Sequence, residues 1–74
     1  MMIPDKELYE IVGGRIRMSR QKAGLTQLEL ADLCGFEKAN ISRIERGCTN
    51  LTIKTLYKIC VSLNIKMEDI MTEL

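Results

Sequence analysis

The sequence predicts a compact all-α domain of five short helices. Two observations support this class: apolar residues recur every three or four positions, and cap residues and glycines divide the chain at intervals that suit short helices rather than strands. With 74 residues, the chain has room for one core. We therefore expect residues 1–74 to form a single domain.

The first helix is expected to begin at Pro4 and Asp5 and to end before Gly24. Its apolar stripe consists of Leu8, Ile11, Val12 and Ile16. The pair Gly13-Gly14 interrupts this helix without the strand and the Gly-Lys-Ser/Thr sequence that a phosphate-binding loop requires. Close packing or a kink is the better explanation.

The second helix carries a strong start signal, because Thr26 and Glu29 have the spacing of a capping box. Leu25, just before the N-cap, and Leu30, within the first turns, occupy the two positions of a hydrophobic staple. The helix is expected to end at Cys34, since Gly35 can adopt the left-handed conformation of a tight reversal.

A third helix is predicted from Glu37 to Arg46, closed by Gly47. At about 100° per residue, Ile41 and Ile44 point the same way and Glu45 flanks them. The opposite face and its sides carry Lys38, Ala39, Asn40, Ser42, Arg43 and Arg46. The isoleucines thus anchor the helix and leave a cationic, amide-rich face outward.

The fourth helix repeats these signals, with Thr52 as N-cap and Asn64 as C-terminal cap. We expect one of its faces to be buried, namely Ile53, Leu56, Ile59, Cys60 and Leu63. A last short helix over 67–71 offers an apolar stripe made of Met67, Ile70, Met71 and Leu74.

Composition excludes several classes of function. No apolar run is long enough for a membrane span or a signal peptide, so we expect a cytoplasmic protein with no membrane contact. The chain lacks histidine, and the spacing of Cys34, Cys48 and Cys60 fits no zinc module. We expect buried, inert thiols at Cys34 and Cys60, no metal, no cofactor and no enzymatic activity.

Net charge is only +1, but the basic residues gather in two blocks, over 15–28 and 38–58. The second block includes the outward face of the third helix. Arginine can grip a guanine edge, asparagine an adenine edge, and alanine allows close approach in the major groove of DNA. The alternative is an ordinary solvated face, which is common on surface helices.

The stretch "RIRMSRQKAGLTQLELADLCGFEKANISRIERG" resembles the phage-repressor type of helix-turn-helix protein, also called Cro-like, xenobiotic-response-element type or lambda-repressor-like. Its arginine-rich first helix and its "LTQ", "LA" and "IERG" elements carry the resemblance, and "TLYKICVSLNI" extends it to the fourth helix. The resemblance implies a double-stranded DNA partner, and it implies that the second helix of the motif, here the third helix of the chain, enters the groove.

The resemblance also implies a structural ion pair between Arg20 and Glu45. The predicted helix independently places Glu45 near the inward side, where an unpaired carboxylate is costly. The alternative is a carboxylate that is solvated at the rim.

By position, Lys38, Ala39, Asn40 and Arg43 match the residues that face base edges in this family. Gln27 matches a glutamine that contacts a phosphate, beside a helix N-terminus. Further candidates for the DNA backbone come from the basic blocks and the loop after the third helix, namely Arg17, Arg46, Asn50 and Lys54. Each of these residues is alternatively a solvated surface residue.

We expect a transcription regulator that binds a pseudo-palindromic operator as a homodimer, and no small-molecule ligand. The stripe of Met67, Ile70, Met71 and Leu74 is the expected dimer interface, unless it caps the core. A second hypothesis is a protein-interaction module, antitoxin-like or polymerase-contacting, that uses Leu28, Leu33 and the methionines as its contact surface.

Overall fold

The computed structural model describes residues 2–74, and this part of the chain is all-helical. In chain order the helices are α1 (Asp5–Lys22), α2 (Gln27–Cys34), α3 (Lys38–Glu45), α4 (Ile53–Leu63) and α5 (Met67–Met71). This confirms the predicted fold class and the order of the elements. α3 is shorter than expected by one residue at each end, since Glu37 and Arg46 are its caps.

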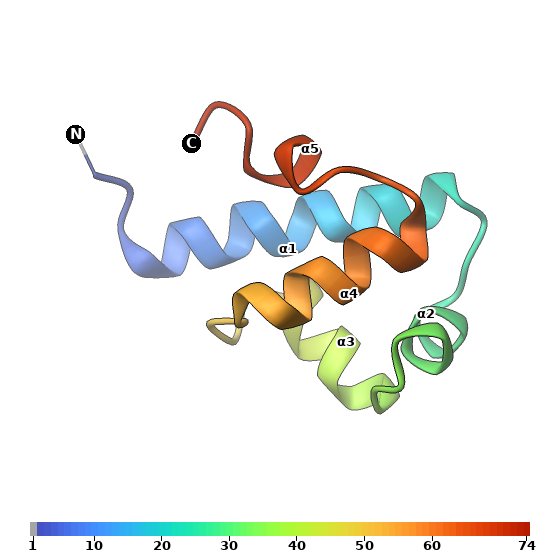
Figure 1. Ribbon diagram of the computed structural model, residues 1–74. Helices are drawn as coiled ribbons and strands as arrows, with labels where there is room; N and C mark the ends of the chain where they lie inside the picture. Colours follow the sequence, from blue (N-terminus) through green and yellow to red (C-terminus); the bar gives the residue numbers. More distant parts are fainter. Residues whose placement is uncertain (1) are drawn as a thin grey trace.

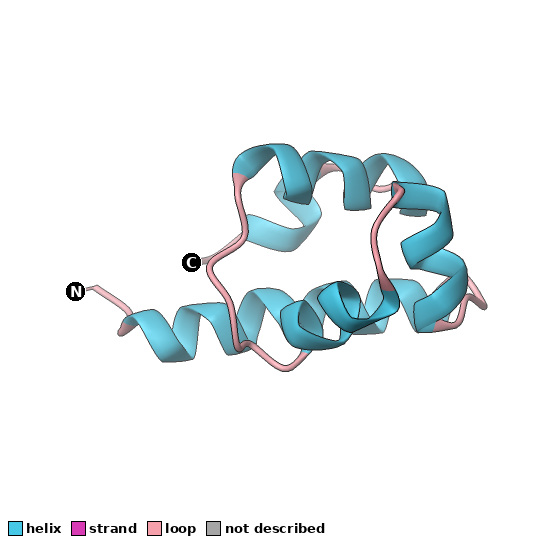
Figure 2. Cartoon of the chain, turned by 90° about the horizontal axis from the view of Figure 1, so that it is seen from below, coloured by secondary structure: helices cyan, strands magenta, loops and turns pink. Residues whose placement is uncertain are grey.

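Helix α1 runs along one side of the molecule, and α4 and α5 lie against it (Figure 1). Helices α2 and α3 pack on each other, and α3 also packs against α1. Loops and turns, pink in the view from below, connect the helices (Figure 2). The radius of gyration of 11.4 Å equals the value of about 11 Å expected for a compact chain of this length. The start of α1 and the C-terminus lie toward the same end of the molecule (Figure 1).

Local capping fixes the start of α2 and of α4. The Thr26 hydroxyl accepts from the Glu29 amide at 3.1 Å, and the Glu29 carboxylate accepts from the Thr26 amide at 2.9 Å. The Thr52 hydroxyl accepts from the Thr55 amide at 3.1 Å in the same way. Both starts follow the capping signals of the sequence.

The core draws on all five helices. Its least exposed large side chains are Ile16, Leu30, Ile41, Ile59 and Ile70. The prediction for Ile53 was wrong: this residue is 78% exposed, whereas the other four residues of the predicted α4 face are buried. On a helical wheel Ile53 lies about 70° from the centre of the face that the other four residues form, further round than any of them.

Gly13 is the point of closest approach between α1 and α3. A Cβ atom built there would lie 2.1 Å from the carbonyl oxygen of Ile44, while the same atom at Gly14 would meet nothing within 4 Å. α1 continues through both glycines. Close packing at Gly13 is therefore the explanation of the pair.

The cysteines are free thiols, with Cys34 and Cys60 buried as predicted and Cys48 exposed. Burial, followed by the nearby Asp69 carboxylate, raises the pKa of the Cys60 thiol. Within residues 2–74, no helix combines the length and apolar character that crossing a bilayer would require.

Candidate nucleic-acid interface

Helix α3 presents one polar face to solvent. Ile41 and Ile44 are buried and attach the helix to the core. The four residues that sequence reasoning assigned to base edges are all exposed: Lys38, Ala39, Asn40 and Arg43. Because α3 is anchored on one side only, its outward face is free to contact another molecule.

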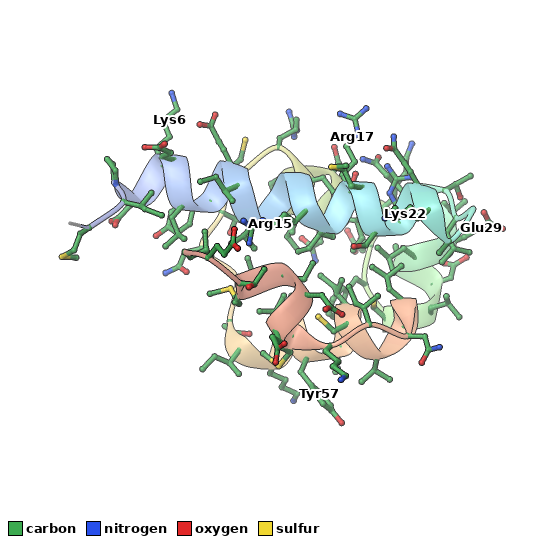
Figure 3. The ribbon with its side chains drawn as sticks, turned by 90° about the horizontal axis from the view of Figure 1, so that it is seen from above. Lys6, Arg15, Arg17, Lys22, Glu29 and Tyr57 are labelled. Carbon is green, nitrogen blue, oxygen red and sulfur yellow. The ribbon has the colours of Figure 1, made fainter. Side chains whose placement is uncertain are left out.

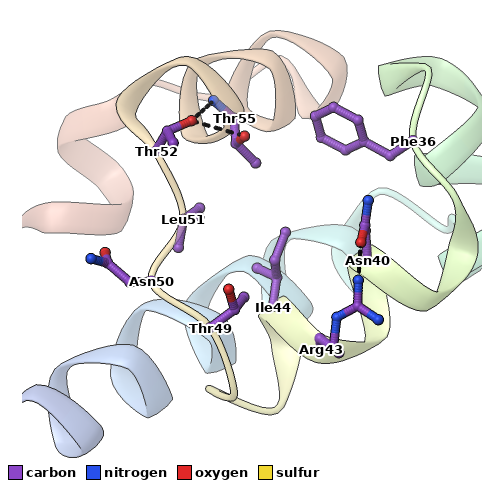
Figure 4. Close-up of a pocket in the computed structure, with 9 residues that line it drawn as sticks. All are labelled: Phe36, Asn40, Arg43, Ile44, Thr49, Asn50, Leu51, Thr52 and Thr55. Atoms are coloured by element: carbon purple, nitrogen blue, oxygen red, sulfur yellow. Dashed lines mark hydrogen bonds between the residues drawn. The ribbon is translucent and has the colours of Figure 1, made fainter.

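A hollow of about 210 Å³ lies between α3 and the start of α4 (Figure 4). Asn40, Arg43 and Asn50 line it together, so the structure brings two candidates for base reading next to one for the backbone. The Arg43 guanidinium donates to the Asn40 side-chain oxygen across one turn of α3 (Figure 4). This contact places the two polar groups side by side.

The remaining candidates for the DNA backbone do not form one cluster. Arg46 at the C-cap of α3, Lys54 in the first turn of α4 and Arg17 on α1 are all exposed. In Figure 3, Arg17 projects on the side of α1 opposite to that of Tyr57 on α4. Gln27 is half-buried, and its side-chain amide donates to the Glu45 carboxylate at 3.1 Å.

Arg20 and Glu45 form a buried, bidentate ion pair between α1 and α3. The Nε of Arg20 lies 2.6 Å from Oε2 of Glu45, and its Nη2 lies 2.9 Å from Oε1. The two residues are 8% and 7% exposed. This hydrogen-bonded carboxylate raises the pKa of Arg20, although burial alone would lower it. Glu45 therefore serves the fold, with its charge compensated.

The C-terminal stripe does not form one surface. The prediction of Ile70 as an interface residue was wrong, because Ile70 is 1% exposed and belongs to the core. Met67 is half-buried against the core, while Met71 and Leu74 remain exposed. Since α5 is short, its sequence pattern did not reveal which side α1 and α4 cover.

Sequence reasoning missed the apolar surface of α4. Ile53, Tyr57 and Val61 are exposed and lie four residues apart, so they share one side of the helix. Ile53 and Met71 also line a mainly apolar hollow of about 140 Å³ together with Tyr9. The four-residue spacing of Ile53, Tyr57 and Val61 was visible in the sequence, but Ile53 was assigned to the buried face of the helix instead.

Arg15 also has a role that the sequence did not indicate. Its guanidinium donates to the carbonyl oxygens of Ile70 at 2.8 Å and Thr72 at 2.6 Å. It thereby ties the end of α5 to α1. The place of Arg15 in a basic block suggested a cation exposed at the surface. No local signal in the sequence distinguishes such a cation from one that binds the carbonyl oxygens at the end of α5.

Comparison with known proteins gives a consistent result. A family model described as helix-turn-helix matches residues 16–70, which is more than half of the chain. This range starts within α1 and ends within α5, so it includes the whole polar face of α3.

Similar proteins include transcriptional regulators and antitoxins. A helix-turn-helix transcriptional regulator of Sinorhizobium fredii is 32% identical over 66 residues, 89% of this chain and 86% of that protein. The antitoxin HipB of Escherichia coli is 40% identical over 52 residues, which are 70% of this chain but only 59% of HipB. The restriction-modification controller protein C.AhdI of Aeromonas hydrophila has a similar structure, with a TM-score of 0.80 and 30% identity, covering 86% of this chain and 96% of the other.

Proposed function

This chain belongs to the helix-turn-helix family, and we propose that it is a DNA-binding transcriptional regulator that recognises a pseudo-palindromic operator as a homodimer. The exposed polar face of α3 is the observation that carries this proposal. A helix fits the major groove of B-DNA, where base edges differ in their donors and acceptors. Lys38, Asn40 and Arg43 would read those edges, and Ala39 would allow the backbone to come close.

Contacts to phosphates would fix the register of α3 in the groove. The candidates for these contacts are Asn50, which lines the hollow beside Asn40 and Arg43, together with Gln27 at the start of α2 and Lys54 in the first turn of α4. Arg46 at the end of α3 and Arg17 on α1 add positive charge to these contacts. Such contacts strengthen binding to any DNA sequence and carry no sequence information themselves.

Two copies are proposed because a single eight-residue recognition helix reaches few bases. We place the interface on the exposed apolar side of α4, which consists of Ile53, Tyr57 and Val61. Met71 and Leu74, which are also exposed, would extend it. Isologous pairing of one such surface with its copy is the usual arrangement of a dimer. A homodimer of this kind fits autoregulation, in which protein concentration sets occupancy of the operator.

A protein-interaction module is the second candidate. The similarity to the antitoxin HipB favours it, as does the exposure of Leu28 and Leu33 on α2. In this function the same fold would hold another protein through apolar contacts.

The salt dependence of binding separates the two functions. A protein that neutralises about six phosphates loses on the order of a thousandfold in DNA affinity between 50 and 200 mM salt. We expect that loss in fluorescence anisotropy with labelled duplexes of mixed sequence. Absence of DNA binding at 50 mM salt would contradict the proposed function and leave the interaction module.

A further inference from the structure

The carboxylate of Glu45 joins three helices. From its place at the end of α3, it accepts from the Arg20 guanidinium on α1 and from the Gln27 amide on α2. Arg20 extends this network, since its Nη1 donates to the Leu25 carbonyl oxygen at 2.8 Å. The network therefore fixes the turn between α1 and α2 as well as the start of α2.

A carboxylate only accepts hydrogen bonds, so it selects one orientation of the Gln27 amide. The NH₂ group must face Glu45, and Nε2 lies 3.1 Å from Oε1. The opposite orientation would place two acceptor oxygens against each other. Arg20 holds the carboxylate in place through two hydrogen bonds of its own, so the acceptor is fixed before any partner arrives.

The second N–H of the same amide is left for another acceptor. Gln27 is the first residue of α2 and is only half-buried, so solvent or a ligand can reach this side chain. A DNA phosphate oxygen needs a donor, and a donor whose rotamer is already fixed loses less conformational entropy on binding.

We propose that Glu45 is a positioning residue for DNA binding, which holds the Gln27 amide so that its second N–H meets a phosphate. This role rests on the proposed function and adds to the structural ion pair with Arg20. It couples the packing of α1, α2 and α3 to one phosphate contact. Glu45 itself touches no DNA in this arrangement.

A double-mutant cycle tests the coupling. Gln27→Ala and Glu45→Asp are made singly and together in the full chain, because aspartate keeps the charge but withdraws the carboxylate by one methylene. Affinity is measured for a duplex selected by the parent protein from a random pool, below the melting temperature of every variant. Gln21→Ala, which removes an exposed glutamine of α1 that is outside the network, is the control.

We expect Gln27→Ala to weaken binding about tenfold per protomer. Glu45→Asp should weaken binding in the parent. The same change should weaken binding much less in the Gln27→Ala background, where its fold loss in affinity should be at least about five times smaller. Because neither change alters net charge, the slope of affinity against salt should stay constant. An equal loss from Glu45→Asp in both backgrounds would show a purely structural role and overturn the proposal.

A second measurement needs neither DNA nor a destabilising variant. In the NMR spectrum of the free parent protein, one side-chain amide proton of Gln27 should be shifted downfield and exchange more slowly than those of Gln21. Indistinguishable behaviour of the two glutamines would overturn the positioning role while leaving the proposed function intact. A parent protein that binds no duplex would instead overturn the proposed function and this role with it.

Discussion

At the scale of single residues, the buried pair of Arg20 and Glu45 determines how α1 meets α3. Two charges under the surface are tolerated because each finds several partners. Among residues 2–74, no buried side-chain nitrogen or oxygen lacks a hydrogen-bond partner. Replacing one member of such a pair is costly, because the remaining charge is left in a site that water barely reaches.

We therefore predict that Arg20→Ala lowers the free energy of unfolding by about 3 kcal/mol or more. For a domain of this size, the melting temperature should fall by more than about 10 °C. Circular dichroism melts of both proteins provide the measurement. Arg17→Ala removes an exposed arginine of the same helix and should change the melt little. Identical melts for Arg20→Ala and the parent would mean that the pair does not stabilise the fold.

At the scale of elements, the contact between α1 and α3 depends on the absence of a side chain at Gly13. The backbone oxygens of Ile44 and Glu45 occupy the space that a Cβ atom would need. These are backbone atoms of a packed helix and cannot rotate away as a side chain can. Gly13 thus sets the distance between the two helices that the ion pair also joins.

We predict opposite effects for two neighbouring substitutions. Gly13→Ala should destabilise the protein by about 2 kcal/mol or more, because α1 and α3 must move apart. Gly14→Ala should stabilise it by about 0.5 to 1 kcal/mol, since alanine favours the helix and meets no neighbour. Urea unfolding of the two variants and the parent measures both changes. Similar values for the two variants would contradict this packing.

The helices could be predicted because their signals are local. Thr26, Glu29 and Thr52 cap within three residues of themselves, and the structure places these caps where the sequence indicated. The sequence could not supply the tertiary contacts between helices. The burial of Ile70 and the bond from Gln27 to Glu45 depend on which helix lies next to which, and no local pattern encodes that.

At the scale of the whole molecule, the polar face of α3 and the exposed apolar residues of α4 suit two different partners. In the proposed homodimer, twofold symmetry would place the two copies of α3 about 34 Å apart, one turn of the duplex. The molecule measures 36 × 22 × 20 Å, so a pair of protomers has the dimensions to span two successive major grooves. Affinity and specificity would then depend on both surfaces.

We predict that Val61→Lys weakens self-association by at least about tenfold, since a charge in an apolar interface is costly. Val61 is exposed, so the fold itself should persist. Sedimentation equilibrium over a range of protein concentrations provides the measurement. Met18→Lys, which places the same charge at an exposed apolar residue of α1, is the control. Equal association of the Val61 variant and the parent would remove α4 from the interface.

The central claim is that the outward face of α3 reads a DNA sequence. Selection of duplexes from a random pool, with the purified parent protein and with Arg43→Ala, tests it most directly. We predict that the parent enriches a pseudo-palindrome, and that Arg43→Ala loses about 1 to 3 kcal/mol of discrimination at one base step in each half-site. A parent that enriches no sequence, or an Arg43→Ala variant that enriches the same sites with the same preference, would contradict the claim.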